Sequence, residues 1–171
     1  RSLEAFRQQH PNHPLAAEVG AKLSVAYLEK GNWSQAAGEF ERLAASSKDE
    51  KIARGALWQA AELHEKANVR PAAAKTYERY LTLYPHPLQT NLEARYRLAQ
   101  MAKADGNAAR EQALMKEIFR ADQTGGSART DRTRHLGALG ALVMAEPALE
   151  AYRKVALVEP LAKNLKLKKS K

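Results

Sequence analysis

The stretch KLSVAYLEKGNWSQAAGEFERL (residues 22–43) sets the period of the chain, because closely similar stretches follow it. Placed over QAAELHEKANVRPAAAKTYERY (59–80), 37 residues later, it pairs small residues with small ones and Phe40 with Tyr77. A third copy, RLAQMAKADGNAAREQALMKEI (97–118), begins after a further 38 residues. A repeat of this length is typical of stacked helical units.

Each copy has the pattern of a helix, a short turn and a second helix. Alanine and leucine recur at three- and four-residue spacing, and no alternating run of β-branched residues is long enough for a strand. Gly31, Asn68 and Gly106 occupy the turn, where glycine or asparagine tolerates a positive φ. Asn32 and Asn107 are expected to cap the helices that follow. The sequence therefore predicts an all-α chain of antiparallel helix pairs.

The apolar positions of these helices predict the core. His64 falls at the position that Tyr27 fills in the preceding copy, so we expect it to be partly buried. The acidic pairs Glu39 with Glu41 and Glu62 with Glu65 are expected to face solvent, and Ser47 to Glu50 forms a capping-box pattern. The predicted core consists of Leu23, Tyr27, Phe40, Ala60, Ala73, Tyr77 and Leu98.

Prolines and histidines mark the joints between copies. HPNHPL (10–15) and YPHPL (84–88) lie two repeat periods apart. Two histidines beside prolines could form half of a metal site, but no HExxH motif or carboxylate–histidine cluster stands near them. We therefore interpret His10, His13 and His86 as parts of turns and predict no metal or cofactor.

These residues resemble the tetratricopeptide repeat, and the resemblance covers about residues 15–122. It implies a right-handed α-solenoid with a concave groove lined by the first helix of each pair. The joint phrases FRQQHPNHP (6–14) and YERYLTLYPHPLQTNLEARYRLA (77–99) are similar to those of bacterial envelope repeat proteins. The third copy departs from the pattern, since Glu111 stands where alanine is expected. Matching residues are Leu23, Ser24, Tyr27, Gly31, Ala36 and Phe40; Leu57, Ala60, Ala61, Ala73, Tyr77 and Pro85; and Leu98, Ala99 and Gly106.

The resemblance divides the chain into helix pairs and a cap. Residues 1–14 are expected to end a preceding repeat, and a glycine-containing break falls at 123–127. Residues 128–171 are expected to form a helical cap with a truncated basic end. The expected pairs are 15–47, 48–87 and 88–122.

Within the cap, helical spacing predicts which residues pack. Leu136, Leu139 and Val143 share one helix face, and Gly137 and Gly140 favour close packing. We expect further helices to begin at Pro147 and Pro160, the last carrying Lys163, Lys166, Lys168, Lys169 and Lys171.

The family's groove positions give the candidate binding surface. Trp58 and Tyr96 fall at the same repeat position and are expected to anchor a partner, or else to pack between repeats. Ala21 and Val25 replace the lysine and asparagine of the family's carboxylate clamp, which disfavours a receptor for peptide C-termini. The candidate residues are Glu18, Ala21, Val25, Leu28, Trp58, Glu62, Glu65, Glu93, Tyr96, Gln100 and Lys103.

Composition excludes several function classes. Cysteine is absent, no nucleophile elbow or phosphate loop occurs, and we predict no catalytic residue. The longest weakly polar run, residues 136–145, is too short to span a bilayer. The chain begins with Arg1 and carries no signal-peptide pattern, so we interpret it as a segment of a longer protein.

Two functions remain. The first is a protein–protein scaffold that binds a peptide or helix in a bacterial envelope or periplasmic complex. The alternative is an electrostatic adaptor for nucleic acid or an anionic polymer, because residues 129–171 hold ten Lys and Arg against four Asp and Glu. Residues 1–128 hold eighteen against fifteen, so the net charge of +9 lies mostly in the C-terminal quarter.

Overall fold

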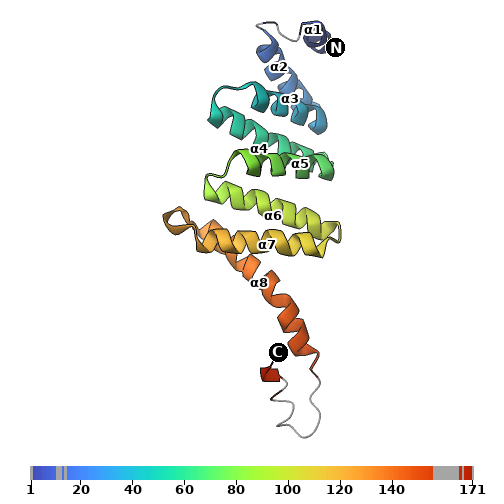
Figure 1. Cartoon of the computed structure of the whole chain (residues 1–171). Coiled ribbons are helices and arrows are strands. Elements are labelled where there is room, and N and C mark those ends of the chain that lie inside the picture. The colour runs from blue at the N-terminus through green and yellow to red at the C-terminus, as the bar shows by residue number, and fades with distance from the viewer. Residues whose placement is uncertain (1, 11–12, 14, 156–165, 167, 171) are drawn as a thin grey trace. The chain divides into compact units, whose positions relative to one another are not determined.

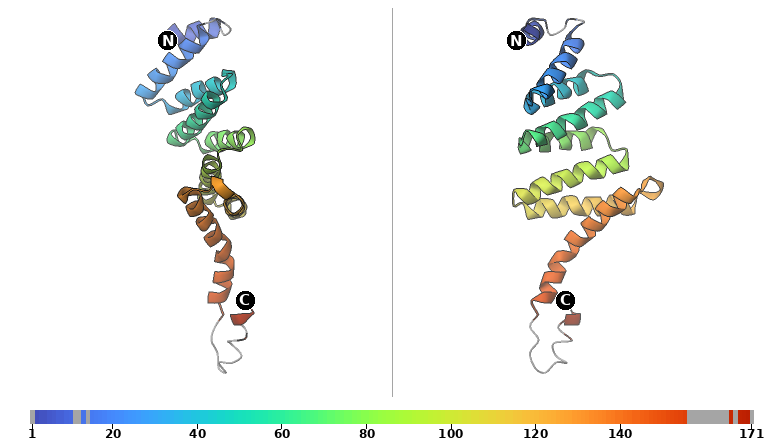
Figure 2. Two further views of the ribbon diagram at one scale, coloured as in Figure 1. Left: turned by 90° about the vertical axis from the view of Figure 1, so that its left-hand side faces the viewer. Right: turned by 180° about the vertical axis from the view of Figure 1, so that it is seen from behind.

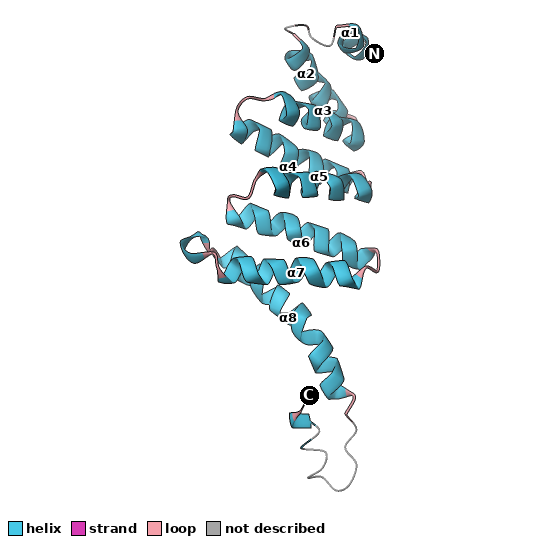
Figure 3. Ribbon diagram, viewed as in Figure 1, coloured by secondary structure: helices cyan, strands magenta, loops and turns pink. Residues whose placement is uncertain are grey.

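The computed structural model describes residues 2–10, 13, 15–155, 166 and 168–170, and every regular element in these ranges is helical (Figures 1 and 3). Eight α-helices and one short 3₁₀ helix follow one another, and the described residues contain no strand. The prediction of an all-α chain is confirmed.

The chain divides into two compact units, Arg1–Pro85 (unit 1) and His86–Lys171 (unit 2). Unit 1 contains α1 (Ser2–Gln9), α2 (Ala16–Glu29), α3 (Trp33–Ser46), α4 (Glu50–Lys66) and α5 (Arg70–Leu83). Unit 2 contains α6 (Leu88–Ala104), α7 (Ala108–Gln123), the 3₁₀ helix η1 (Gly126–Ala128) and α8 (Asp131–Arg153). Within each unit, consecutive α-helices pack against each other.

The turns inside the helix pairs have the predicted backbone. Gly31 ends α2 at φ 70°, Asn68 separates α4 from α5 at φ 57°, and Gly106 separates α6 from α7 at φ 71°. A left-handed residue at this place lets the chain leave one helix and enter the next within a few residues. The repeated sequence thus places the same turn at three corresponding points.

The core of unit 1 is built from small residues. Ala36 and Ala37 of α3 are fully buried with Leu63 of α4, and this cluster is covered by Tyr27 and Phe40. The core prediction is confirmed for Leu23, Ala60, Ala73, Tyr77 and, in unit 2, Leu98, all of which are buried.

Tyr27 and Phe40 are only half-buried, so their assignment to the core was too strong. The Tyr27 hydroxyl donates a hydrogen bond to Glu4 of α1, which holds that ring at the edge of the helix pair. Both rings cover a core of alanines instead of filling it.

Two predicted helix starts differ in detail. α4 is capped by Asp49, whose Oδ1 accepts from the backbone N–H groups of Lys51 at 2.8 Å and Ile52 at 3.1 Å, so the capping box at Ser47 is wrong. A carboxylate two residues closer to the helix reaches its free N–H groups better than Ser47 can. Asn107 caps α7 through its side chain, whereas Asn32 holds the cap position of α3 without a side-chain bond.

Unit 2 is held together by one apolar cluster shared by α6, α7 and α8. Leu92, Met115, Ile118 and Leu136 are buried in it, and Leu139 and Val143 are among the residues that pack against it. The prediction that Leu136, Leu139 and Val143 share one packing face is therefore confirmed.

Glycines allow α8 to approach α7 closely. A Cβ at Gly140 would lie 2.5 Å from the backbone oxygen of Met115, and one at Gly137 would lie 2.8 Å from Oδ2 of Asp122. These distances are too short for any side chain, which confirms the close packing expected from the two glycines.

α8 is one helix from Asp131 to Arg153, so the prediction that a new helix begins at Pro147 is wrong. Proline removes the N–H that would bond the carbonyl of Val143, but Pro147 is exposed and water can satisfy that oxygen. The C-terminal half of α8 projects away from α6 and α7 in each view (Figures 1 and 2). The predicted helix start at Pro160 lies outside the described residues.

Hydropathy gives no sign of a membrane span. Among the described helices, none combines the length and the apolarity needed to cross a bilayer.

Candidate partner-binding surfaces

The N-terminal histidines form an aromatic group with Phe6. The Phe6 ring lies 5.2 Å from the ring centroids of both His10 and His13, and Nδ1 of His13 accepts the backbone N–H of Leu15 at 3.2 Å. Among the described residues, no group of three or more metal-binding side chains gathers anywhere. The contacts of these histidines are those of a turn before α2.

His64 joins three helices of unit 1. Its Nε2 lies 3.3 Å from Oε1 of Glu41 on α3, and the hydroxyl of Thr76 on α5 donates to the same oxygen at 3.0 Å. His64 and Thr76 are buried, as the repeat alignment predicted for His64. Nδ1 of His64 is buried without a hydrogen-bond partner. This cluster packs the three helices together.

Glu39 differs from its predicted place. It was expected to face solvent but is only 5% exposed, and Arg42 donates to its Oε1 at 2.7 Å. A Cβ at Gly20 on α2 would lie 3.7 Å from Oε2 of Glu39, an ordinary van der Waals distance, so α2 passes directly beside this carboxylate. A charged side chain is thus enclosed at the α2–α3 contact with a cation beside it.

On α2, the predicted surface residues divide between solvent and core. Ala21 is exposed and Val25 is 54% exposed, whereas Leu28 packs against the alanine cluster. Glu18 is exposed and binds Lys22 at 2.8 Å; this hydrogen bond and the lysine charge lower the pKa of Glu18. α2 therefore presents a small apolar patch of Ala21 and Val25 next to a surface ion pair.

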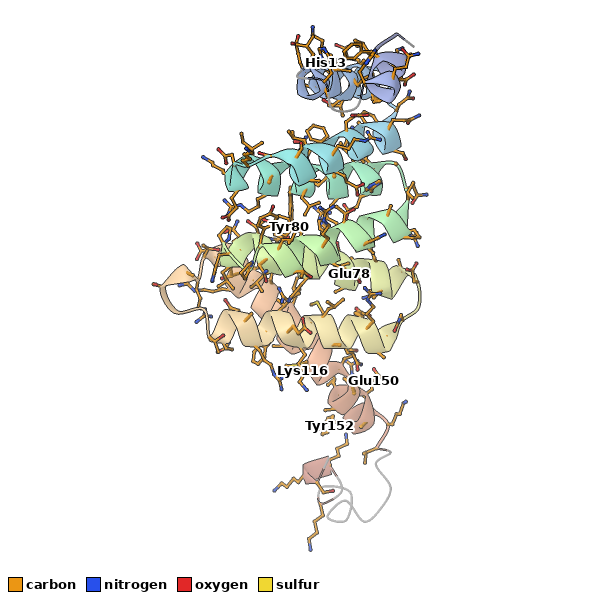
Figure 4. The ribbon with its side chains drawn as sticks, turned by 45° about the horizontal axis from the view of Figure 1, so that its top comes forward. His13, Glu78, Tyr80, Lys116, Glu150 and Tyr152 are labelled. Carbon is orange, nitrogen blue, oxygen red and sulfur yellow. The ribbon has the colours of Figure 1, made fainter. Side chains whose placement is uncertain are left out.

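On α4, the predicted anchor Trp58 already has partners within its own helix pair. Its ring contacts Tyr77 and Tyr80 of α5 edge-on, with centroids 5.4 and 5.3 Å apart (Figure 4 labels Tyr80). Trp58 is half-buried, which agrees with the packing alternative for this residue. Glu62 is exposed and Glu65 is half-buried one turn further along the helix.

In unit 2, Arg132 of α8 occupies the corresponding face of α6. Its Nε and Nη2 lie 2.5 and 3.0 Å from the carboxylate oxygens of Glu93, and its guanidinium carbon is 5.9 Å from the ring of Tyr96. The bond to Glu93 is the main reason that the pKa of Arg132 is raised. Gln100 and Lys103 remain exposed, and Lys103 lies 3.7 Å from Glu111. Of the predicted surface on α6, the C-terminal residues Gln100 and Lys103 are exposed, and Arg132 covers the N-terminal part.

The arginines in the described part of the C-terminal quarter are paired with carboxylates. Arg129 binds Asp122 through two hydrogen bonds of 3.0 and 2.7 Å, and Arg134 lies 2.9 Å from Asp131. Asp122 is the most enclosed of these carboxylates. Burial acts to raise its pKa, but the hydrogen bonds from Arg129 and Thr133 and nearby arginine charge outweigh it and lower the pKa.

One apolar surface was not predicted as a site. Five exposed residues follow one another along α8 at alternating spacings of four and three residues, and we call this set the α8 stripe. The alternation is the signal by which the sequence could have revealed it. The stripe consists of Ala138, Leu142, Ala145, Leu149 and Tyr152.

The structure thus divides the predicted surface between two units. The α2 and α4 positions belong to unit 1, and the α6 positions belong to unit 2. Trp58 and Tyr96, the predicted anchors, both have contacts inside their own unit. Comparison with protein-family models, with curated proteins and with solved structures found no match. The function is therefore inferred from these contacts and exposures.

Proposed function

We propose that this chain is a non-catalytic protein-binding scaffold. Its helix pairs, each turned by a residue with positive φ, are consistent with a tetratricopeptide-like right-handed solenoid that binds a peptide or helix of a partner. The similarity of its joint phrases to envelope repeat proteins favours a bacterial envelope or periplasmic complex.

The exposed face of α2 carries this proposal. Val25 is more than half exposed beside Ala21, whereas Val19 and Leu23 of the same helix are buried. Glu62 on α4 is exposed at the equivalent position of the next copy. The small apolar patch on α2, together with the acidic Glu62 at the equivalent position of α4, suits a neutral or basic amphipathic segment of a partner.

Electrostatic binding of nucleic acid is the weaker candidate. Arg129, Arg132 and Arg134 make ion pairs with Asp122, Glu93 and Asp131. Guanidinium groups already paired with carboxylates contribute less to phosphate binding, which leaves mainly the terminal lysines for that function.

Site-specific photo-crosslinking tests the scaffold proposal. Benzoylphenylalanine is placed at Val25 or Glu62, and in a control at the exposed Lys75 of α5. After irradiation in extract of the source cell, we expect the same discrete protein to be captured from positions 25 and 62 but not from 75. Equal capture from all three positions, or none from the first two, would rule out a binding face on α2 and α4.

A further inference from the structure

The α8 stripe lies on the side of α8 opposite to its buried face. Leu136, Gly140 and Val143 point toward α7 and α6, and the stripe residues are half a helical turn away from them. Leu142 is 65% exposed, Leu149 41% and Tyr152 43%. Large apolar side chains repeated at this spacing on an exposed helix face indicate a surface that another helix covers.

Small residues beside the stripe favour a helix as the occupant. Ala138 and Ala145 belong to the stripe itself, and Ala141 and Ala148 follow one of its edges. Side chains this short let a partner backbone approach closely, so that longer side chains of the partner can fill the spaces between Leu142, Leu149 and Tyr152.

Positive charge gathers at the C-terminal end of the stripe. Nζ of Lys168 lies 4.6 Å from the ring centroid of Tyr152, which places the described helical turn of Lys166, Lys168 and Lys169 beside this end of α8. Lys166 and Lys169 are exposed. Figure 4 shows Tyr152 and Glu150 on the part of α8 that lies beyond α7.

One further cation at this end of the stripe, Arg153, is paired with Glu150 of α8. Arg153 lies at the edge of the stripe and is 3.3 Å from Glu150 in a pair exposed to solvent. A surface pair of this kind contributes little energy, so its arginine is available to a competing carboxylate. The three lysines add positive charge beside it.

We propose that the α8 stripe binds an acidic amphipathic helix of a partner protein. The apolar face of the partner covers Leu142, Leu149 and Tyr152, and its carboxylates meet Lys166, Lys169 and Arg153. The charge complementarity at this end sets the orientation of the partner. This surface is separate from the face of α2 and α4 described above, and it does not depend on the function proposed for that face.

Other occupants fit this chemistry less well. In a parallel pair of two copies, the lysines of one would meet the lysines of the other. An anionic membrane fits less well because only three large apolar side chains of the stripe, Leu142, Leu149 and Tyr152, are available for insertion. The test below separates both possibilities from the proposal.

The test measures binding of two labelled synthetic peptides to the whole chain by fluorescence anisotropy. Both are about three heptads long with leucine at the seam, and they differ only in carrying Glu or Lys at the flanking positions. We expect the Glu peptide to bind at least about tenfold more tightly than the Lys peptide, with affinity that falls as salt is added.

Variants locate the binding. The double change Leu142→Glu and Leu149→Glu should weaken the Glu peptide by about tenfold or more, whereas Ile52→Glu, at a similarly exposed residue of unit 1, should not change it. Lys166→Glu with Lys169→Glu should remove most of the preference for the Glu peptide. Circular dichroism melting of each variant should match that of the unchanged chain, because all the altered side chains are exposed.

Five outcomes would overturn the proposal. The first four are equal binding of the two peptides, an equal effect of Ile52→Glu, a dimer in sedimentation that Leu142→Glu dissociates, and phosphatidylglycerol vesicles that bind through Leu142 when the Glu peptide does not. A clear drop in melting temperature on Leu142→Glu would likewise show that the chain itself covers the stripe.

Discussion

Gly140 lies so close to α7 that a Cβ on it would be 2.5 Å from the backbone oxygen of Met115. The obstructing atom belongs to a helix backbone and cannot rotate away, in contrast to a flexible side chain. The contact between α7 and α8 therefore requires glycine at this position.

Replacing Gly140 by Ala should destabilise unit 2 by about 1–3 kcal/mol, because α8 must move away from α7 to make room. Gly55→Ala is the matched control: Gly55 is in α4, is exposed and has no atom within 4 Å of a Cβ, so alanine should stabilise its helix by up to about 1 kcal/mol. Denaturant unfolding followed by circular dichroism measures both. If Gly140→Ala were as stable as the original chain, the close approach of α8 would be incorrect.

Asp122 should make the stability of unit 2 depend on acid. Its pKa is lowered in the folded chain, so its contribution is complete above the unfolded pKa of about 3.9 and is lost as pH falls through the lower folded value. Asp122→Asn removes the charge that Arg129 and Thr133 hold in place, and it should cost about 2 kcal/mol at neutral pH.

The measurement is the free energy of unfolding of both proteins between neutral pH and about pH 2. The two curves should begin to approach each other below about pH 4 and should converge only below the lowered folded pKa of Asp122, where protonation removes the same charge from the unchanged chain. Curves that stay parallel down to the lowest pH would contradict the role given to this carboxylate.

Trp58 should contribute to stability, since its ring packs on Tyr77 and Tyr80. We expect Trp58→Ala to cost about 2–3 kcal/mol, which is less than for a fully buried tryptophan. Glu62→Ala, one turn later on the same helix and exposed, should change stability by less than about 0.5 kcal/mol. A Trp58 variant that melts like the Glu62 variant would restore Trp58 as a free anchor for a partner.

The turns were predictable from sequence because their causes are local. Gly31, Asn68 and Gly106 each stand where a helix must end with positive φ, and no distant residue is needed to see this. The contact between Arg132 and Glu93 is different, because the two residues are 39 positions apart and meet only after α6, α7 and α8 have packed. Sequence alone could place Glu93 on the first helix of a pair, but it could not show that an arginine covers it.

Burial was predictable for the small residues but less so for the large ones. Ala36 and Ala73 occupy the same repeat position in two successive copies, and both are fully buried. Phe40 and Tyr27 occupy equally regular positions, yet they lie at the rim of the alanine cluster and remain half-exposed. Periodicity identifies the face of a helix, whereas the depth of burial depends on the neighbouring helices.

The depth of burial gives a prediction for a pair of leucines. Leu57 is fully buried in unit 1, so Leu57→Ala should cost about 2–5 kcal/mol. Leu142→Ala removes the same atoms from an exposed site on α8 and should cost less than about 0.5 kcal/mol. Denaturant unfolding of both variants is the measurement. Similar losses in the two proteins would mean that Leu142 is covered in solution.

The terminal lysines should not make the chain a nucleic-acid-binding protein. Lys166 and Lys169 are exposed, but among the described residues of the C-terminal quarter Arg129 and Arg132 are held by Asp122 and Glu93 in partly buried pairs. These two arginines are therefore less available to release counterions from phosphates. Binding to a DNA duplex should therefore be weak and independent of sequence, and it should disappear near physiological salt, about 0.15 M.

A gel-shift series at rising salt tests this, with the intact chain compared with the variant that carries Lys166→Glu and Lys169→Glu. A shallow salt dependence with tight binding, abolished in the variant, would favour the electrostatic adaptor over the scaffold. Weak binding that vanishes by about 0.15 M salt in the intact chain is the result expected when the lysines serve a protein partner.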